Sequence, residues 1–217
     1  MPIFAALNGV PVAHGRIYIP ATGMIVADVV LVSATDPTGP QTLVFAGLTI
    51  KCAVHRAINW VGVRGVRLIG GAGGWRQPLP PKPYQSTSQI LTSTIVSDAA
   101  ASVGELPPQL AIDLPVGQTW IRVGGKASNV LNDLLKDGWW MDPAGIVQTK
   151  PRDATLISSD YVVTRVQGAP GRYVVASEAP EDWMPGRKFQ TTTAQNTVSR
   201  VMHTIEPKAV KTEVLSP

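Results

Sequence analysis

The chain has 217 residues, of which 44% are hydrophobic and only 16% are charged, and 20 glycines and 19 prolines are spread along it. This length is enough for one large domain or for two small ones with cores of their own. Frequent Gly and Pro favour short strands joined by turns and argue against a helical bundle. A low charged fraction leaves few polar groups to cover the surface, so we expect buried subunit contacts and an oligomer.

Charge and cysteine content exclude several classes of function. The 19 Lys and Arg residues outnumber the 15 Asp and Glu residues, but no run of three cations occurs, which gives little support to specific nucleic-acid binding. Cys52 is the single cysteine, so the chain can build neither an internal disulfide nor a thiolate zinc cluster. The N-terminus lacks a charged leader, and no apolar stretch approaches the ~20 residues that span a bilayer, so we expect no membrane anchor.

The first 70 residues carry the pattern of a small β-barrel. Residues 16–33 predict a hairpin around the turn Pro20-Ala21-Thr22-Gly23. Residues 42–56 alternate apolar and polar side chains, which predicts one long, half-buried strand that bends or bulges at Gly47-Leu48. Residues 61–69 predict a further strand. About five strands before residue 70 are enough to close a barrel.

The segment that follows combines loops with one helix. A glycine-rich run at residues 70–75 precedes a proline-rich passage at 77–84, which can be neither a helix nor a central strand. The hydroxyl residues at 86–88 can cap a helix that runs to Val103 and ends at Gly104. A strand is predicted within residues 112–123.

Helix, turn and strand signals agree best in residues 126–152. Ser128 can cap a short helix whose apolar residues share one face, and Gly138 stands where a left-handed C-terminal residue is expected. The turn Asp142-Pro143-Ala144-Gly145 then joins two short strands. Trp139-Trp140 alternates across the first strand, so we expect one ring in the core and the other facing outward or toward a partner.

Strand patterns return in the last third of the chain, at residues 161–166, 172–177, 197–205 and 212–215. We therefore predict a mainly β (α+β) protein with two small antiparallel β-barrel domains and a helix-containing αβ insert between them. The expected boundaries are residues 1–78 for the first barrel, 79–150 for the helix-and-hairpin insert and 151–217 for the second barrel.

No motif points strongly to catalysis or to a cofactor. The run at residues 70–74 lacks the Lys-Ser or Lys-Thr and the helix that follow a phosphate-binding loop, so close backbone packing against a neighbouring strand or subunit is the better interpretation. The three histidines lie far apart without i, i+4 spacing, so no metal site is predicted. Glu105 and Asp113 are the carboxylates that a weak hydrolase hypothesis would use. We predict no enzymatic activity and no cofactor.

The order of several motifs resembles the baseplate or tail-tip hub proteins of tailed bacteriophages and related contractile injection machines. The central motif is the helix, tryptophan pair, Asp-Pro-x-Gly turn and Pro-Arg pair within residues 126–152. The other matching segments are residues 20–23 with 27–29, the glycine-rich segment 67–75 with its proline tail, the helix end near 104–105, and segments 184–186, 198–203 and 211–214. Together they span nearly the whole chain.

This resemblance implies a structural virion protein of the phage tail baseplate that is made in the host cytoplasm and forms a homotrimer. The six barrels of three subunits would form a ring that joins the tail tube protein to the central spike protein and contacts wedge or other baseplate proteins. The tape-measure protein and DNA would leave through the enclosed channel without specific binding. Many relatives are longer, so the chain resembles a reduced hub, which argues against an attached spike or lytic function.

Candidate contacts with another subunit or partner are seven large side chains: Trp75, Trp139, Trp140, Trp183, Arg64, Arg67 and Arg200. An alternative function is a β-barrel module that binds carbohydrate or single-stranded nucleic acid through exposed tryptophans, with Trp75, Trp139 or Trp140 as the stacking surface. A monomer whose tryptophan fluorescence changes with ligand would distinguish this module from a hub.

Overall fold

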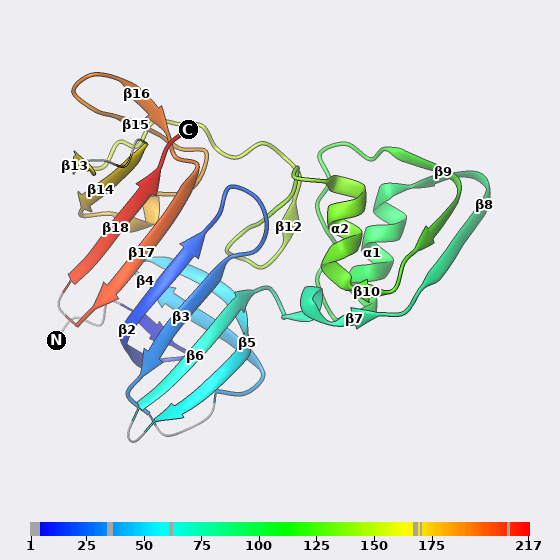
Figure 1. The fold of residues 1–217 in the computed structure, drawn as a ribbon, viewed down its shortest axis with the longest axis horizontal. Helices are drawn as coiled ribbons and strands as arrows, with labels where there is room; N and C mark the ends of the chain where they lie inside the picture. Colours follow the sequence, from blue (N-terminus) through cyan, green and yellow to red (C-terminus); the bar gives the residue numbers. More distant parts are fainter. Residues whose placement is uncertain (1–4, 34–36, 61–62, 167–168, 170, 208) are drawn as a thin grey trace.

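The computed structural model describes residues 5–33, 37–60, 63–166, 169, 171–207 and 209–217. Figure 1 shows a β region made from both ends of the chain and a smaller helical lobe that projects to one side. The predicted mainly β fold, with a barrel and a helix-containing insert, is confirmed, and the strands of the last third, predicted as a second barrel, continue the sheet of the first barrel.

Six strands in the first third of the chain form a closed antiparallel barrel. Their order is β1-β4-β5-β6-β3-β2, and the pairing of β1 with β2 closes the ring. The strands are β1 (Ala5–Leu7), β2 (Val10–Ile19), β3 (Val26–Leu31), β4 (Pro40–Phe45), β5 (Leu48–Trp60) and β6 (Val63–Gly70). Alternation along each strand sends apolar side chains into the barrel, as the burial pattern of β4 shows.

The last third of the chain continues the same sheet. The end of β2 pairs with β17, and the order then runs β17-β18-β14-β13. The elements of this region are β13 (Tyr161–Arg165), β14 (Arg172–Ser177), the short helix η2 (Pro180–Asp182), β15 (Lys188–Gln190), β16 (Gln195–Thr197), β17 (Arg200–Glu206) and β18 (Ala209–Leu215). Trp183 and Phe189 pack in one hydrophobic core with barrel residues such as Phe45, so the two β regions share both a sheet and a core.

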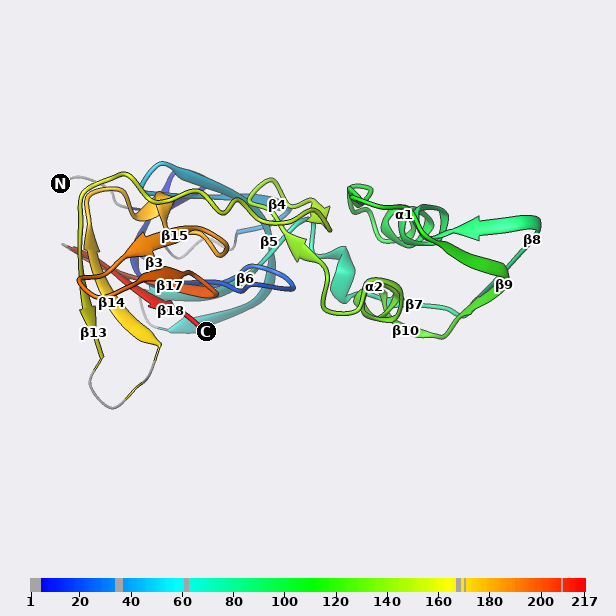
Figure 2. The same cartoon turned by 90° about the horizontal axis from the view of Figure 1, so that it is seen from above.

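The helical lobe has a hydrophobic core of its own. Its elements are η1 (Gly74–Arg76), β7 (Pro78–Leu79), β8 (Lys82–Leu91), α1 (Thr92–Ser102), β9 (Pro115–Arg122), β10 (Gly125–Lys126), α2 (Ala127–Leu135), β11 (Trp140–Met141) and β12 (Val147–Gln148). Helices α1 and α2 lie side by side, and the β8–β9 hairpin forms the far end (Figure 2). The core contains Trp75, Ile95, Leu131 and Trp139.

The helix predicted from residues 86–88 begins later than expected. Residues 82–91 instead form β8, which pairs with β9 and places Tyr84 opposite Trp120 with ring centroids 5.7 Å apart. The hydroxyl residues that suggested a cap, at 86–88, lie in an irregular part of this strand between the pairs Gln85–Thr119 and Ile90–Gly117, where the Ser86 hydroxyl accepts from Ser88 N–H over 3.1 Å. The expected end is correct, because Gly104 follows α1 with a left-handed φ of 72°.

The long strand predicted over residues 42–56 is a hairpin. Ala46 and Gly47 have φ angles of 42° and 87°, so both central residues of the turn between β4 and β5 are left-handed. Phe45 pairs with Leu48 directly across this turn. A two-residue turn preserves the alternation of the flanking strands, and for this reason the pattern resembled one continuous strand.

The unit at residues 126–152 matches the prediction with two shifts. Helix α2 starts at Ala127, one residue before the predicted cap Ser128, and Lys136 rather than Gly138 adopts the positive φ after it. The predicted turn is confirmed, since Gly145 N–H donates to the Asp142 carbonyl over 2.9 Å and the Asp142 carboxylate accepts from Ile146 N–H.

A buried carboxylate joins the helical lobe to the barrel. Glu105, 7% exposed, accepts hydrogen bonds from the backbone N–H groups of Ala72, Gly74 and Trp75 over 3.0, 2.6 and 3.3 Å. Side chains are excluded here, because a Cβ atom at Gly74 would lie 2.1 Å from the Val103 carbonyl oxygen. The glycine-rich loop therefore packs closely against the segment that follows α1.

The β11–β12 hairpin adds a second connection to the barrel. Met141 N–H donates to the Gly23 carbonyl, and Gly23 N–H donates to the carbonyl of Trp139, both in the turn region between β2 and β3. On the other side, Lys51 N–H in β5 donates to the Pro143 carbonyl over 2.8 Å. The hairpin is thereby fixed to two neighbouring parts of the barrel.

We predict that Glu105→Ala lowers the free energy of unfolding by about 3 kcal/mol, because three buried amides lose a charged acceptor. Glu206→Ala, at an exposed carboxylate on β17, is the matched control and should change it by less than about 0.5 kcal/mol. Urea denaturation followed by circular dichroism measures both values. Equal stability of the two variants would show that the amides find other acceptors.

We also predict a loss of stability at mildly acidic pH that depends on His203. Its ring is fully buried, its centroid lies 4.9 Å from that of the tilted Phe45 ring, its Nδ1 lies 2.9 Å from the Thr212 hydroxyl, and burial lowers its pKa to about 3. The unfolded chain takes up this proton near pH 6.5, so stability is complete above that pH and falls by about 1.4 kcal/mol per unit as the pH decreases toward 3.

Between pH 7 and pH 5 the native chain should therefore lose about 2 kcal/mol more stability than His203→Gln, which keeps a polar partner for Thr212 but cannot take up a proton. His55→Gln, at an exposed position, is the control and should follow the native chain. Parallel stability curves for all three proteins would contradict the assignment to His203.

Candidate partner-binding surface

Four of the seven predicted contact residues are buried within the folded molecule. Trp75 and Trp139 pack in the core of the helical lobe, Trp183 packs in the β core, and each is at most 5% exposed. Arg64 on β6 is also 5% exposed. The sequence suggested that these side chains meet a partner, but the structure uses the largest rings to fill two small cores.

Trp140 is half-buried and packs against Arg152, which follows the β11–β12 hairpin in the chain. The Arg152 guanidinium lies 4.1 Å from the centre of its indole ring and donates to the carbonyls of Ala21 and Pro20 over 2.9 and 2.7 Å. Burial lowers the pKa of Arg152 to about 10, which leaves it charged at neutral pH. The expected alternation is confirmed, with Trp139 in the core and Trp140 outside it, but an arginine already covers the Trp140 ring.

The remaining two residues, Arg67 and Arg200, are exposed on the outer face of the shared sheet. Arg67 forms a two-point ion pair with Asp28 over 2.7 and 2.8 Å. Arg200 lies with its guanidinium 5.6 Å from the centre of the Tyr18 ring. These two cations come from different β regions, and the pairing of β2 with β17 brings their strands into one sheet.

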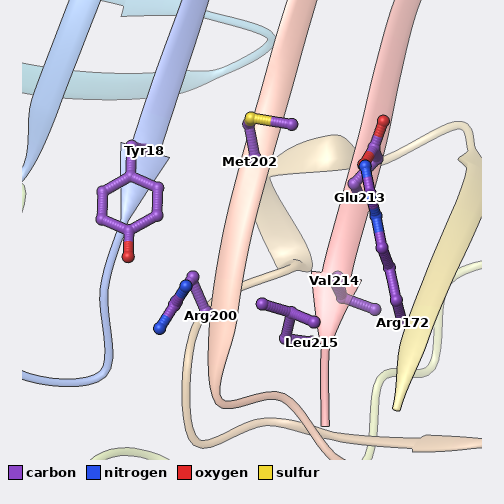
Figure 3. Close-up of a pocket in the computed structure, with 7 residues that line it drawn as sticks. All are labelled: Tyr18, Arg172, Arg200, Met202, Glu213, Val214 and Leu215. Atoms are coloured by element: carbon purple, nitrogen blue, oxygen red, sulfur yellow. The ribbon is translucent and has the colours of Figure 1, made fainter. Parts of the chain in front are cut away.

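Arg200 borders a shallow groove of about 260 Å³ where the two β regions meet (Figure 3). The groove is lined by Tyr18, Arg172, Arg200, Met202, Glu213, Val214 and Leu215. Figure 3 shows Arg200 beside Tyr18 at one side, Arg172 beside Glu213 at the other, and Met202 and Leu215 between them. An apolar floor between charged walls is typical of a protein-binding surface.

Charges at the two sides of the groove differ in how they are satisfied. Arg172 forms an ion pair with Glu213, and Lys211 contacts the same carboxylate over 2.9 Å. Burial opposes ionisation of Glu213, but hydrogen bonds from these two cations lower its pKa below the ordinary value. Arg200 lies against the Tyr18 ring and has no ion pair among the described residues, so its guanidinium can donate hydrogen bonds to a carboxylate of a partner.

A row of charged side chains crosses the same outer face next to the groove. Residues directly opposite each other on paired strands point to the same side of a sheet. The register places in one row, from β5 to β18, the residues Arg56, Arg67, Asp28, Arg16, Thr204 and Lys211. We call these six residues the basic row, since they carry four cations and one carboxylate.

Reactive groups in the described part of the chain already have structural partners. Cys52 is buried, as expected for a core residue, and burial raises the pKa of its thiol to about 11. The Glu105 carboxylate binds three amides, and Asp113 accepts from Ser93 N–H at the start of α1 over 2.9 Å. Among the described residues there is no cluster of three or more metal-binding side chains. In the same residues, no helix is long and apolar enough to cross a membrane.

Neither the groove nor the basic row was predicted from the sequence. Tyr18, Met202 and Leu215 look like ordinary members of alternating strands, and Arg16 and Arg56 are isolated cations in the sequence. What unites them is the register between strands that are far apart in the chain. Alternation alone gives the face on which a residue lies but not its neighbour on the next strand.

The chain matches no protein-family model and no curated protein sequence. Its fold, however, matches solved structures. One is the Escherichia coli c3393 protein, described as a component of the type VI secretion system with structural similarity to the T4 bacteriophage tail proteins gp27 and gp5. The TM-score is 0.71 at 14% identity, and the match covers 98% of this chain and 76% of that one.

Two tail proteins give similar results. A tail protein from Neisseria meningitidis MC58 matches with a TM-score of 0.62 at 12% identity, over 98% of this chain and 96% of that one. The 43 kDa tail protein of prophage MuSo2 from Shewanella oneidensis matches with a TM-score of 0.58 at 8% identity, over 98% and 95%. Together with the barrel and its insert, these matches show that the chain has the hub-like fold of phage tail proteins and of a related secretion component.

Proposed function

We propose that the chain is a structural component of a phage tail or related injection machine and acts as the hub of its baseplate. The observation that carries this proposal is the match of 98% of the chain to tail proteins and to a type VI secretion component with the same arrangement of barrel and insert. Catalysis is not part of the proposal, since the carboxylates and thiol with catalytic potential have structural roles.

In this proposal three copies form a ring in the virion that joins the tail tube protein to the central spike protein. Wedge or other baseplate proteins contact its outside, and the tape-measure protein and DNA pass through its channel. The outer face of the shared sheet supports lateral contacts, because it combines an apolar groove with unsatisfied cations. Within each copy we propose residues 1–78, 79–150 and 151–217 as domains; the first and last share a sheet and a core through the β2–β17 pairing, and η1 at the end of the first packs into the core of the helical lobe.

The binding-module alternative has less support from the described residues. Trp75 and Trp139 are buried, and Arg152 occupies one face of the half-buried Trp140 ring, so the three tryptophans form no open stacking platform. A carbohydrate or single-stranded nucleic acid would have to use other groups. The groove at Arg200 is lined by one aromatic ring, that of Tyr18.

We predict that the purified chain forms a trimer whose population rises with concentration. Light scattering over a concentration series measures the mass, and particle imaging shows whether the trimer is a ring with an axial hole. A chain that remains monomeric at all concentrations, both alone and with tube and spike proteins added, would contradict the hub. A monomer whose tryptophan fluorescence shifts with an oligosaccharide or single-stranded DNA would favour the binding module.

A further inference from the structure

Two of the four cations in the basic row, Arg56 and Arg16, are not neutralised by the described part of the chain, whereas Lys211 contacts Glu213 over 2.9 Å. Arg67 occupies both oxygens of Asp28, the single carboxylate of the row. Arg56 stands directly opposite Arg67, and Arg16 directly opposite Asp28, yet neither Arg56 nor Arg16 has an anionic partner among the described residues. Like charges opposite each other on a sheet are destabilising. A chain with few charges has thus concentrated cations on one face.

A complementary acidic segment lies between β14 and β15. It contains Glu178, Glu181 and Asp182, and none of these carboxylates forms an ion pair with a described residue. The next residue, Trp183, is buried in the β core and fixes the position of this segment. Its ring centroid lies 5.4 Å from that of Phe189 and 5.1 Å from that of Tyr161. We call residues 178–182 the acidic segment.

The acidic segment and the basic row lie on opposite sides of the shared sheet. On β17, Val201 and His203 point inward to the core that holds Trp183, whereas Met202 and Thr204 point outward to the groove and the row. Figure 2 likewise places β15, and the gold segment that precedes it, on one side of β17 and β18. One copy of the chain cannot bring its two charged surfaces together.

We propose that the acidic segment of one copy docks on the basic row of a second copy. This inference rests on the proposed function, since it assumes a hub that assembles with itself, and it identifies the two surfaces that meet. Surfaces on opposite sides of a molecule form a head-to-tail contact, which closes into a ring when the rotation between copies allows it. Six neighbouring strands give the row a length of about 24 Å, enough for a segment of several residues.

The surroundings of the row favour a protein occupant over nucleic acid. The row borders the groove whose floor consists of Met202 and Leu215, and a phosphate backbone would leave such an apolar floor unfilled. The acidic segment is followed by Met184, which is only partly buried, so this part of the chain offers apolar as well as acidic contacts. A second copy therefore satisfies both the charge and the apolar surface.

A charge-exchange experiment tests the docking. The row variant carries Arg16→Glu and Arg56→Glu, the segment variant carries Glu181→Lys and Asp182→Lys, and a third protein carries all four changes. The control, Lys126→Glu with Lys150→Glu, makes the same change in charge at exposed sites of the helical lobe. Sedimentation velocity over a concentration series, at about 50 and 500 mM salt, measures self-association, and circular dichroism verifies folding.

We expect the row and segment variants each to raise the dissociation constant for self-association at least about tenfold, since attractive pairs become repulsive. The protein with all four changes should return to within about threefold of the native value, because the charges are exchanged but complementary. High salt should weaken association of the native chain, and the control should behave like the native chain.

The outcomes separate this inference from the hub proposal. A native trimer whose affinity is unchanged in both variants overturns the docking and leaves the hub intact. A row variant that weakens association while the segment variant does not, or a four-change protein that fails to recover, also overturns it. Salt-sensitive binding of single-stranded DNA that only the row variant loses would assign the row to nucleic acid. A native chain that never associates overturns the trimer as well.

Discussion

The arrangement of the molecule depends on one buried carboxylate, that of Glu105. The loop leaving β6 offers three N–H groups with no strand to pair with, and Glu105 accepts all three. Buried amides without an acceptor would cost free energy, and successive N–H groups in a loop form a natural anion site. These three hydrogen bonds join the loop after β6 to the segment after α1. They thereby set the position of the helical lobe relative to the end of β6. The glycine-rich loop therefore binds a carboxylate of the same chain, that of Glu105, in place of an external anion.

Because the helical lobe projects from one end of the β region, it leaves the outer face of the shared sheet uncovered. Strand β2 is the pivot, because its first residues close the barrel with β1 and its last residues pair with β17. That pairing makes one outer face from strands that begin nearly 200 residues apart. The groove and the basic row both cross this junction, so neither exists unless the N-terminal and C-terminal thirds fold together.

Local chemistry allowed part of this structure to be predicted from the sequence. The turn at 142–145 and the helix end at Gly104 follow from residue preferences within a few positions, and both were predicted. Asn8-Gly9, with both φ angles positive, is an equally clear hairpin turn. It was not predicted, because a strand of three residues before it is too short to show an alternating pattern. The carboxylate for the glycine-rich loop lies 31 residues beyond Gly74, and the neighbours of Arg16 are set by strand register. Such information resides in tertiary structure and not in local pattern.

The distribution of aromatic and charged residues explains why the outer face is built as it is. The chain forms two separate hydrophobic cores, and large aromatic rings fill both of them. Trp75, Trp139 and Trp183 are all buried. In the proposed assembly, the contact with a partner is therefore made by arginines and by a groove with a floor of Met202 and Leu215. Charge complementarity contributes mainly specificity and the rate of encounter, whereas apolar contact contributes affinity. A surface with a strong basic row and a shallow groove thus favours selective association that remains reversible until further components bind.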